Sequence, residues 1–504
     1  TAVTRELGDV YATRLAERGA LGFYDRHYRQ MFRPLLRTMR HGVRLDEATR
    51  RRQSNRLMAQ CVDIQERLAI IAGGPLHSTA RNKKRDAAGR IPDLSTKKIA
   101  TYLYETLGLT KQVSRKTGRV TTAEVTVRRL MNRYGVAQFD ERCVEDPEAF
   151  KVAGHSQTSE RSWKLSAAGT LILEHRRKKK LGEFLDEGKL DPDGRLRCSY
   201  RFTTENGRLA SRKNPRGTGR NLQNIDRELR HVFVADEGCV FVECDLSQAE
   251  SRVVSVLTGD PEMIEIARSK PWEFDVHTYN AGIIFKKLAQ DVTPKERYLG
   301  KRGVHGAHYG LGGTRLSELL LLDGFTVPPE QAQEMIDVYL GAHSGAILNW
   351  QRSTRYTVLT TRTLVNSWGR AIEFTYDRMD DDLFRRAYAF VPASEVADLL
   401  NQWGYILLDQ LIRERQMRSR INMQNHDALL VSCPPGEVWT VIEFLWRSLE
   451  RPRLYRGVEL VIPCGFKIGE TWKGSVEFKR LPTREDVEEA VRQLVGNGPG
   501  LSVR

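Results

Sequence analysis

Two aspartates in different local settings place the strongest constraint on how this chain can fold. Asp245 ends the β-prone stretch 231–245 and is followed by a helical segment. Asp427 directly follows His426 near the tip of a hairpin predicted over residues 418–433. If the fold brings these strand ends together, two carboxylates on rigid elements can hold two divalent cations about 3.5–4 Å apart. Either aspartate alone is weak evidence, because turns also favour aspartate.

A local alternative exists for the first aspartate. Ser247 and Glu250 match the S-x-x-E pattern of a capping box at the start of the helical segment. In that interpretation Glu250 only caps a helix, and Asp245 only caps or turns the chain.

A basic segment lies between the two aspartates in the sequence. Its key residues recur every four positions: Arg297, Lys301, His305 and Tyr309. Each step turns only about 40° around a helix, so they share one broad stripe. Cations on such a stripe can bind phosphates, and a flat ring can pack on a base or sugar. A solvated basic face is the alternative, and Gly300, Gly303 and Gly306 weaken the helix prediction while allowing a ligand or nucleic acid to approach.

Composition narrows the class of partner. The chain has 504 residues, so we expect two to four subdomains. It carries 80 Lys and Arg against 64 Asp and Glu, a formal charge of +16, which favours a polyanionic partner. Nucleic acid fits better than a membrane, since no long apolar run occurs. A protein that is merely basic is the alternative.

The cysteines argue against a disulfide framework or a zinc site. There are seven, an odd number, and none forms a CxxC pair. A reducing cytoplasm is the expected setting, and no signal peptide is visible.

Local patterns give a coarse secondary structure. Helices are expected over 1–70, 168–187 and most of 247–410. Strands are expected over 196–204, 231–245 and 458–462, and as a hairpin over 418–433. Three basic clusters are expected to contact phosphates of nucleic acid: 81–85, 176–180 and 212–220.

Three ordered blocks carry a resemblance. Residues 245–252 (DLSQAESR) look like motif A of the family A DNA polymerases, usually DYSQIELR. The spacing Arg297-x3-Lys301-x3-His305-x3-Tyr309-Gly looks like motif B, and residues 426–428 (HDA) look like motif C. The chain therefore resembles the relatives of bacterial DNA polymerase I and many bacteriophage replicases. Weaker blocks occur in the family's order: 39–46, 204–211, 221–225, 275–278 and 469–472.

The resemblance implies an α/β right-hand polymerase fold, with an antiparallel palm sheet, helical fingers and a helical thumb. The implied division is 1–25 for the remnant of an upstream exonuclease-like domain, 26–195 thumb, 196–262 first part of the palm, 263–392 fingers, and 393–504 second part of the palm. The implied function is template-directed extension of a primer 3′ end with deoxynucleotides, by two-metal transfer with release of pyrophosphate. The implied partners are primer-template DNA, dNTPs, and processivity or replisome proteins, in the cytoplasm of a bacterium or a phage-infected host.

The resemblance also implies roles for individual residues. Two Mg²⁺ ions, which Mn²⁺ can replace, would be held by Asp245, Asp427 and the backbone carbonyl of Leu246. The catalytic residues would be Asp245, Asp427 and Lys301, the last as the acid for the leaving group. The incoming dNTP would contact Arg297, Lys301, His305, Tyr309, His277, Gln248 and Glu250, with Glu250 excluding a ribose 2′-hydroxyl. DNA would contact Arg208, Gln223, Asn224, Arg386 and His426.

Three departures from the family pattern affect these expectations. His305 stands where Phe or Tyr is usual, and Ala428 where a third acid is usual. Residues 390–395 match the N-x-P-x-Q segment poorly. A single-subunit RNA polymerase is the nearest rival, but it lacks a glutamate equivalent to Glu250. The other rival is a catalytically silent DNA-binding scaffold, against which the intact aspartates and cations argue.

Overall fold

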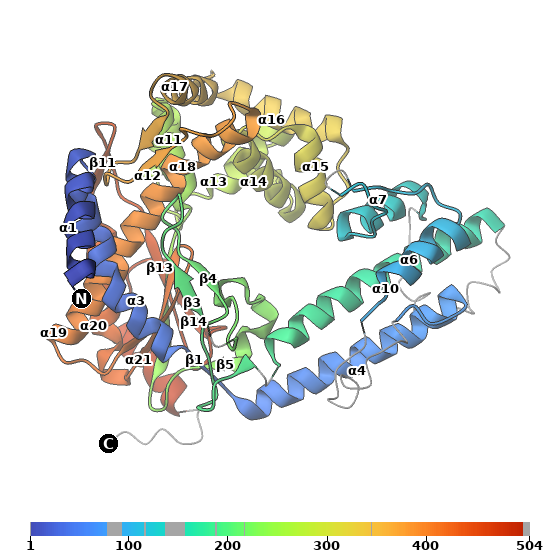
Figure 1. The fold of residues 1–504 in the computed structure, drawn as a ribbon, viewed down its shortest axis with the longest axis horizontal. Coiled ribbons are helices and arrows are strands. Elements are labelled where there is room, and N and C mark those ends of the chain that lie inside the picture. The colour runs from blue at the N-terminus through green and yellow to red at the C-terminus, as the bar shows by residue number, and fades with distance from the viewer. Residues whose placement is uncertain are drawn as a thin grey trace. The chain divides into compact units, whose positions relative to one another are not determined.

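The structure is a computed structural model that describes residues 2–77, 93–114, 117–136, 157–186, 189–215, 217–343 and 345–496 (Figure 1). The chain divides into two compact units. Unit 1 comprises 1–46, 188–313 and 333–504, and unit 2 comprises 47–187 and 314–332. Among the described residues, no helix combines the length and the apolar composition needed to cross a lipid bilayer.

A five-stranded antiparallel sheet forms the centre of unit 1, in the order β14-β13-β6-β10-β9. Its strands are β6 (Val240–Leu246), β9 (Arg420–Asn425), β10 (Ala428–Cys433), β13 (Cys464–Gly469) and β14 (Val476–Phe478). Every residue of β10 is buried, and so is every residue of β6 except Asp245. Apolar, β-branched runs form such central strands because both faces are covered. The predicted hairpin over 418–433 is confirmed.

Helices make up most of the remainder of unit 1 (Figure 1). They include α11 (Ala249–Thr258), α12 (Pro261–Arg268), α13 (Val276–Phe285), α14 (Pro294–His308), α17 (Ala346–Thr361), α18 (Asp381–Leu399), α19 (Leu407–Glu414), α20 (Val438–Leu449) and α21 (Arg484–Gly496). The mainly helical expectation for 247–410 is confirmed, apart from the short pair β7 (Thr363–Val365) and β8 (Ala371–Glu373). Further two-stranded pairs are β3 (Ser199–Arg201) with β4 (Ala210–Arg212), and β11 (Arg453–Tyr455) with β12 (Val458–Leu460).

The N-terminal segment is helical as predicted, with interruptions at residues 18–20 and 42–46. Its helices are α1 (Ala2–Glu17), α2 (Leu21–Phe23), the π-helix η1 (Tyr24–Arg29), α3 (Gln30–His41) and α4 (Glu47–Ala72). Between the last two lies β1 (Val43–Leu45), which pairs with β2 (Arg195–Leu196) and β5 (Phe233–Val234). Gly42 makes this turn at φ 67°, a left-handed conformation that glycine adopts without strain.

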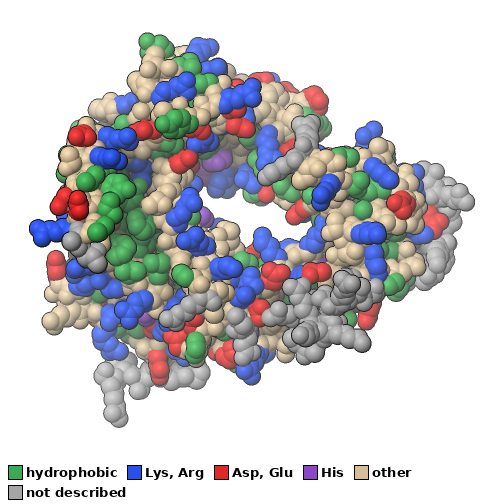
Figure 2. Space-filling view, viewed as in Figure 1, with side chains coloured by type: hydrophobic (Ala, Val, Ile, Leu, Met, Phe, Trp, Pro, Cys, Tyr) green, Lys and Arg blue, Asp and Glu red, His purple; other side chains and the backbone are tan. Residues whose placement is uncertain are grey.

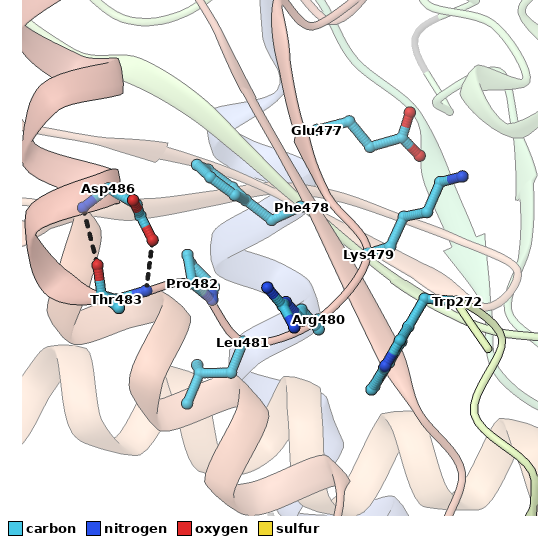
Figure 3. A pocket seen from close by; sticks show the side chains of 9 residues that line it. All are labelled: Trp272, Glu477, Phe478, Lys479, Arg480, Leu481, Pro482, Thr483 and Asp486. Carbon is cyan, nitrogen blue, oxygen red and sulfur yellow. Dashed lines mark hydrogen bonds between the residues drawn. The ribbon is translucent and has the colours of Figure 1, made fainter.

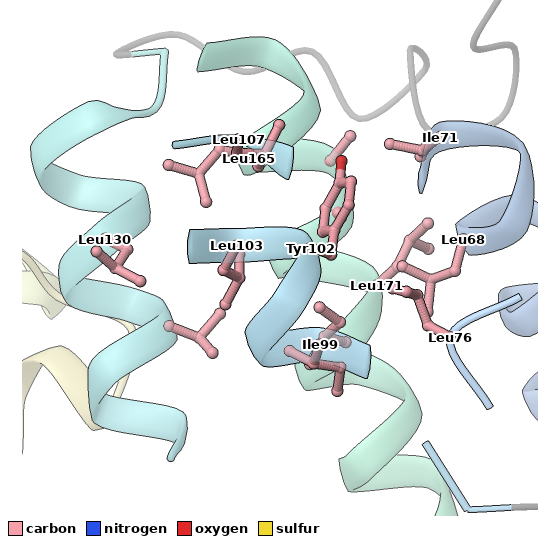
Figure 4. Packing of buried hydrophobic residues seen from close by; sticks show 14 of the residues in the cluster. Leu68, Ile71, Leu76, Ile99, Tyr102, Leu103, Leu107, Leu130, Leu165 and Leu171 are labelled. Carbon is pink, nitrogen blue, oxygen red and sulfur yellow. The ribbon is translucent and has the colours of Figure 1, made fainter. Parts of the chain in front are cut away.

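Unit 2 is helical and has its own core. Besides α4, it contains α6 (Thr96–Thr101), the π-helix η2 (Tyr102–Thr106), α7 (Glu124–Tyr134) and α10 (Gln157–Phe184). Figure 4 shows side chains of all these helices meeting in one cluster, among them Leu68, Ile99, Leu103, Leu130 and Leu171. The helix predicted over 168–187 is confirmed and begins earlier. The basic cluster 81–85 lies outside the described residues.

Candidate active site

The two aspartates meet at one end of the central sheet. Asp245 is the Cα partner of Ala428, the residue after Asp427, and the Leu246 amide donates a hydrogen bond of 3.1 Å to the Asp427 carbonyl. His426 makes the tight turn between β9 and β10 at φ 56°. The structure therefore brings together two carboxylates that lie 182 residues apart in the sequence, Asp245 on β6 and Asp427 in the turn between β9 and β10.

The surroundings of Asp245 disfavour its charged form. Water reaches Asp245, yet the surrounding protein removes enough solvent to raise its pKa to about 7, and the negative charges of Asp427 and Glu243 act in the same direction. A cation beside the pair would relieve this repulsion, and an all-oxygen donor set suits a hard divalent ion. Within the described residues, no group of three or more His, Cys, Asp or Glu side chains gathers into a metal-binding set.

The predicted basic stripe is confirmed as a face of α14. The helix begins with a capping box between Thr293 and Glu296, with Pro294 in its first turn. Lys301 and His305 are exposed, and Arg297 is partly exposed. Tyr309 ends the helix as its C-cap, and its ring stands edge-on to His305 at 4.8 Å between centroids.

The glycines of α14 serve helix packing. A Cβ on Gly300 would lie 2.8 Å from the Cβ of Ala281 in α13, and a Cβ on Gly303 would touch Met335 and Ile284. A Cβ on Gly306 would touch Leu311. The expectation that these glycines open a path for a ligand or nucleic acid is therefore wrong, because protein atoms already fill the space beside them.

Arg297 is held in place by an acid of the neighbouring helix. Asp275 caps α13 by accepting hydrogen bonds from the amides of His277 and Thr278. It also accepts from Arg297, at 2.7 Å from Nε and 3.1 Å from Nη2. Burial opposes ionisation, but the hydrogen bonds from Arg297 and Thr278 hold the pKa of Asp275 well below its ordinary value. Burial and the charges of Lys301 and Arg297 lower the pKa of His277 to about 4, so its imidazole is neutral near pH 7.

A further basic residue, Arg227, acts on Lys301. Although Lys301 reaches the surface, the surrounding protein removes enough solvent to lower its pKa, and the charges of Arg297 and Arg227 lower it further. Arg227 is exposed, on the short helix η5 (Arg227–Val232). Sequence reasoning missed it, although it follows the block 221–225 by only two positions.

Glu250 does not cap its helix. The N-cap of α11 is Gln248, in the left-handed conformation at φ 55° and with no side-chain capping bond. Glu250 instead accepts a hydrogen bond of 2.6 Å from the Tyr309 hydroxyl and forms an ion pair with Arg208. The capping-box interpretation is therefore wrong, and Glu250 joins α11, the end of α14 and the turn that carries Arg208.

The residues expected at DNA occupy different settings. Asn224 and His426 are exposed. Gln223 is buried, and its amide donates to the Leu209 carbonyl at 2.9 Å and to Gln424 Oε1 at 3.2 Å. Arg386 is exposed and paired with Asp377 at 2.6 Å and Glu205 at 2.9 Å.

The basic clusters predicted to contact nucleic acid differ in whether their cations are paired within the protein. In the cluster 176–180, Arg176 donates to the Thr122 carbonyl at 2.7 Å and Lys179 pairs with Asp93. In the cluster 212–220, Arg212 and Lys213 are exposed. Figure 2 shows Lys and Arg side chains over much of the visible face, with acidic side chains among them.

Comparison with known proteins gives a consistent picture. The family model for DNA polymerase family A matches residues 150–474. DNA polymerase I of Aquifex aeolicus is 25% identical over 316 residues, 60% of this chain and 50% of that protein. The thermostable DNA polymerase I of Thermus aquaticus is 25% identical over 468 residues, 89% of this chain and 48% of that protein. This chain thus spans half or less of the length of these relatives.

A solved structure shows the same fold. It is the POL domain of Pol1 from M. smegmatis in complex with DNA primer-template and dNTP. The TM-score is 0.72 at 22% identity, and the match covers 93% of this chain and 74% of that one. The predicted α/β right-hand fold is confirmed by this likeness, which at such identity speaks for the fold alone.

Proposed function

Because this chain belongs to DNA polymerase family A, we propose that it extends the 3′ end of a primer with deoxynucleotides, directed by a template strand, and releases pyrophosphate. One observation carries the proposal. The paired carboxylates Asp245 and Asp427 share unit 1 with the basic face of α14, the combination that nucleotidyl transfer needs. The substrates would be primer-template DNA and dNTPs.

The residues present fit a divalent metal. Asp245, Asp427 and the backbone carbonyl of Leu246 would hold it, with Mg²⁺ or Mn²⁺ as the ion. A bound metal would lower the pKa of the attacking 3′-hydroxyl and stabilise charge on the phosphates.

The cations of the fingers would bind the triphosphate. Arg297 presents a guanidinium oriented by Asp275, and neutral His277 can donate a hydrogen bond to a phosphate oxygen. The lowered pKa of Lys301 makes its ammonium a stronger acid, which suits protonation of the departing pyrophosphate. His305, Tyr309, Gln248 and Glu250 would line the sugar and base, and Arg208, Gln223, Asn224, Arg386 and His426 would position the DNA.

The wider assignments remain proposals. The thumb would comprise 26–195, the fingers 263–392, and the palm 196–262 with 393–504. The setting would be the reducing cytoplasm of a bacterium or a phage-infected cell, and the six cysteines within the described residues are free thiols. Processivity or replisome proteins would be further partners.

Primer extension tests the proposal. The purified chain is given a labelled primer-template with Mg²⁺ and either dNTPs or NTPs. We expect extension with dNTPs, and expect Asp245→Asn or Asp427→Asn to abolish it while DNA binding, read by fluorescence anisotropy, stays near the parent value. Asp291→Asn, an exposed acid just before α14, is the matched control. If either active-site variant extends the primer at nearly the parent rate, Asp245 and Asp427 do not hold two catalytic metal ions. Preference for NTPs would point to an RNA polymerase, and no extension at all to a silent DNA-binding scaffold.

A further inference from the structure

The chain continues beyond the part that the family model matches, and this continuation is folded. The match ends at residue 474, whereas β14 (Val476–Phe478) and α21 (Arg484–Gly496) follow it. Phe478 is the Cα partner of Phe466, so β14 extends the sheet that carries Asp245. The helix buries Val487, Ala490 and Val491. The extension is therefore an integral part of unit 1.

The extension forms most of the wall of a pocket of about 590 Å³. That volume lies within the range of about 300–1,000 Å³ typical of small-molecule sites. Its lining is Trp272, Glu477, Phe478, Lys479, Arg480, Leu481, Pro482, Thr483 and Asp486. Figure 3 shows Trp272 on one side and the Thr483–Asp486 pair on the other, with Arg480, Leu481 and Pro482 between them.

The pocket is lined by two cations, Lys479 and Arg480, and two acids, Glu477 and Asp486. Within the described residues, neither Lys479 nor Arg480 forms an ion pair or a side-chain hydrogen bond, and both are exposed. Asp486 is bonded to the Thr483 amide at 3.0 Å, as part of the start of α21. The other acid, Glu477, lies 3.8 Å from Lys467. Hydrogen bonds from Thr483, helped by the charge of Arg480, lower the pKa of Asp486. The side-chain N–H groups of Lys479 and Arg480 nevertheless make no hydrogen bond within the described residues, so they can bind an anionic group such as phosphate.

The opposite side offers a flat aromatic surface. Trp272 is partly exposed, and Lys270 Nζ lies 5.7 Å from its ring centroid. The apolar side chains of Phe478, Leu481 and Pro482 continue the wall. An indole beside apolar groups is a surface on which a nucleobase stacks, because every base has a π-face.

We propose that this pocket binds one nucleotide unit, with the base against Trp272 and the phosphate at Lys479 and Arg480. The pocket lies near the end of the sheet that carries Asp245, but neither Asp245 nor Asp427 lines it. Gly465 is the Cα partner of Asp245, and a Cβ on Gly465 would lie 3.9 Å from the Cα of Lys479. The backbone of Lys479 is therefore roughly two strand spacings, about 10 Å, from that of Asp245. The unit bound is either part of a single strand or a free nucleotide, and the experiment separates these sources.

Fluorine NMR of Trp272 reads the pocket directly. The full chain is labelled with 5-fluorotryptophan, the Trp272 signal is assigned by its loss in Trp272→Phe, and excess blunt DNA hairpin occupies the duplex-binding surface. An oligothymidylate of about twelve nucleotides is then titrated, and dTMP in a second arm. A shift of the Trp272 signal by the oligonucleotide alone identifies a single strand as the occupant, and a shift by both shows that one nucleotide suffices. No shift in either arm overturns the proposal.

Matched variants separate recognition from general charge. Lys479→Ala/Arg480→Ala should weaken oligonucleotide binding at least about tenfold and reduce the slope of log affinity against log salt by about 1.4. Arg484→Ala/Arg492→Ala removes the same charge from cations that are paired with Glu488 and Glu489, and should change neither. Trp272→Leu should lower affinity by about fivefold to a hundredfold, and Trp272→Phe by much less. Equal effects of the two charge pairs would overturn the proposal.

Binding at this pocket and primer extension can be tested separately. With saturating primer-template of short overhang, Lys479→Ala/Arg480→Ala should extend the primer at the parent rate. A chain without polymerase activity could still show the Trp272 shift, and an active polymerase could lack it. The two outcomes are therefore read independently.

Discussion

Asp275 grips the guanidinium of Arg297 with both carboxylate oxygens, at 2.7 Å and 3.1 Å. The same carboxylate caps α13, so it is fixed to the backbone of one helix while it orients a side chain of the next. A guanidinium has five N–H donors, and the grip uses only Nε and Nη2. Donors remain for a phosphate, so the pair orients Arg297 without saturating it.

Asp275→Asn should therefore raise the KM for dNTP about tenfold, with kcat nearly unchanged. Asparagine still caps a helix, but it no longer provides a charged, two-point grip, and hydrogen bonds to charged groups contribute about 1.5–3 kcal/mol. Steady-state primer extension measures both constants, with Asp291→Asn as the control. A fall in KM would mean instead that Asp275 competes with the triphosphate for Arg297.

Glu250→Ala should reduce discrimination against ribonucleotides at least about tenfold. The side chain links Tyr309 and Arg208, and its removal opens the space that would reject a 2′-hydroxyl. Glu250→Gln keeps the volume and should retain most of the discrimination. The measurement is the ratio of kcat/KM for dNTP to kcat/KM for NTP. If Glu250→Ala does not change this ratio, Glu250 only connects Tyr309 and Arg208 and does not select the sugar.

His305 should stay neutral across the neutral pH range. His305 reaches the surface, but the surrounding protein removes enough solvent to lower its pKa from the ordinary value of 6.5, and the charges of Arg302 and Arg208 lower it further, so it gains a proton only at lower pH. The KM for dNTP of the parent and of His305→Phe should therefore run parallel from about pH 7 to 9 and diverge only below 6.5. There the parent should bind the triphosphate more tightly, because its imidazole becomes positive.

The test also includes the variant His305→Tyr, and it measures how well each enzyme incorporates dideoxynucleotides. If both aromatic variants match the parent in KM, in sugar selection and at every pH, His305 only packs against Tyr309.

A buried ion pair lies where η1 packs near α18, and we expect it to contribute strongly to the free energy of unfolding. Arg370 and Asp398 are 2% and 0% exposed, and their closest atoms lie 2.7 Å apart. His27 lies beside them, 2.9 Å from Arg370 Nη2. Asp398→Asn leaves a buried guanidinium without its counter-charge and should cost about 3–5 kcal/mol in the free energy of unfolding. Denaturation in urea measures it, and Asp382→Asn at an exposed pair should cost no more than about 1 kcal/mol.

The same cluster should make stability depend on pH. Burial and the charge of Arg370 lower the pKa of His27 to about 4, although Asp398 opposes them. In the unfolded chain the imidazole titrates near pH 6.5, so below that value the unfolded state binds the proton first. Its contribution is fully present above pH 6.5 and is lost as the pH falls toward 4. His27→Gln should flatten this part of the stability curve, and an unchanged curve would exclude His27 as its cause.

Local patterns predicted the parts of this protein that depend on local rules. The hairpin that carries Asp427 at its turn and the stripe on α14 follow from residue spacing, which does not depend on what packs around these elements. The capping box failed because Gln248 adopts a left-handed backbone conformation that shifts the helix start beyond Ser247. The pairs Asp275–Arg297 and Arg208–Glu250 join residues 22 and 42 positions apart. No periodicity encodes such pairs, since only tertiary packing creates them.

The glycine contacts between α13 and α14 have a mechanical consequence. Because Gly300 packs directly against Ala281, the backbones of α14 and α13 approach closely, and no large side chain lies between them at this point. Asp275 and His277 at the start of α13, and Arg297 and Lys301 on α14, thus belong to two helices that are in close backbone contact. We therefore expect a displacement of either helix to carry all four side chains together.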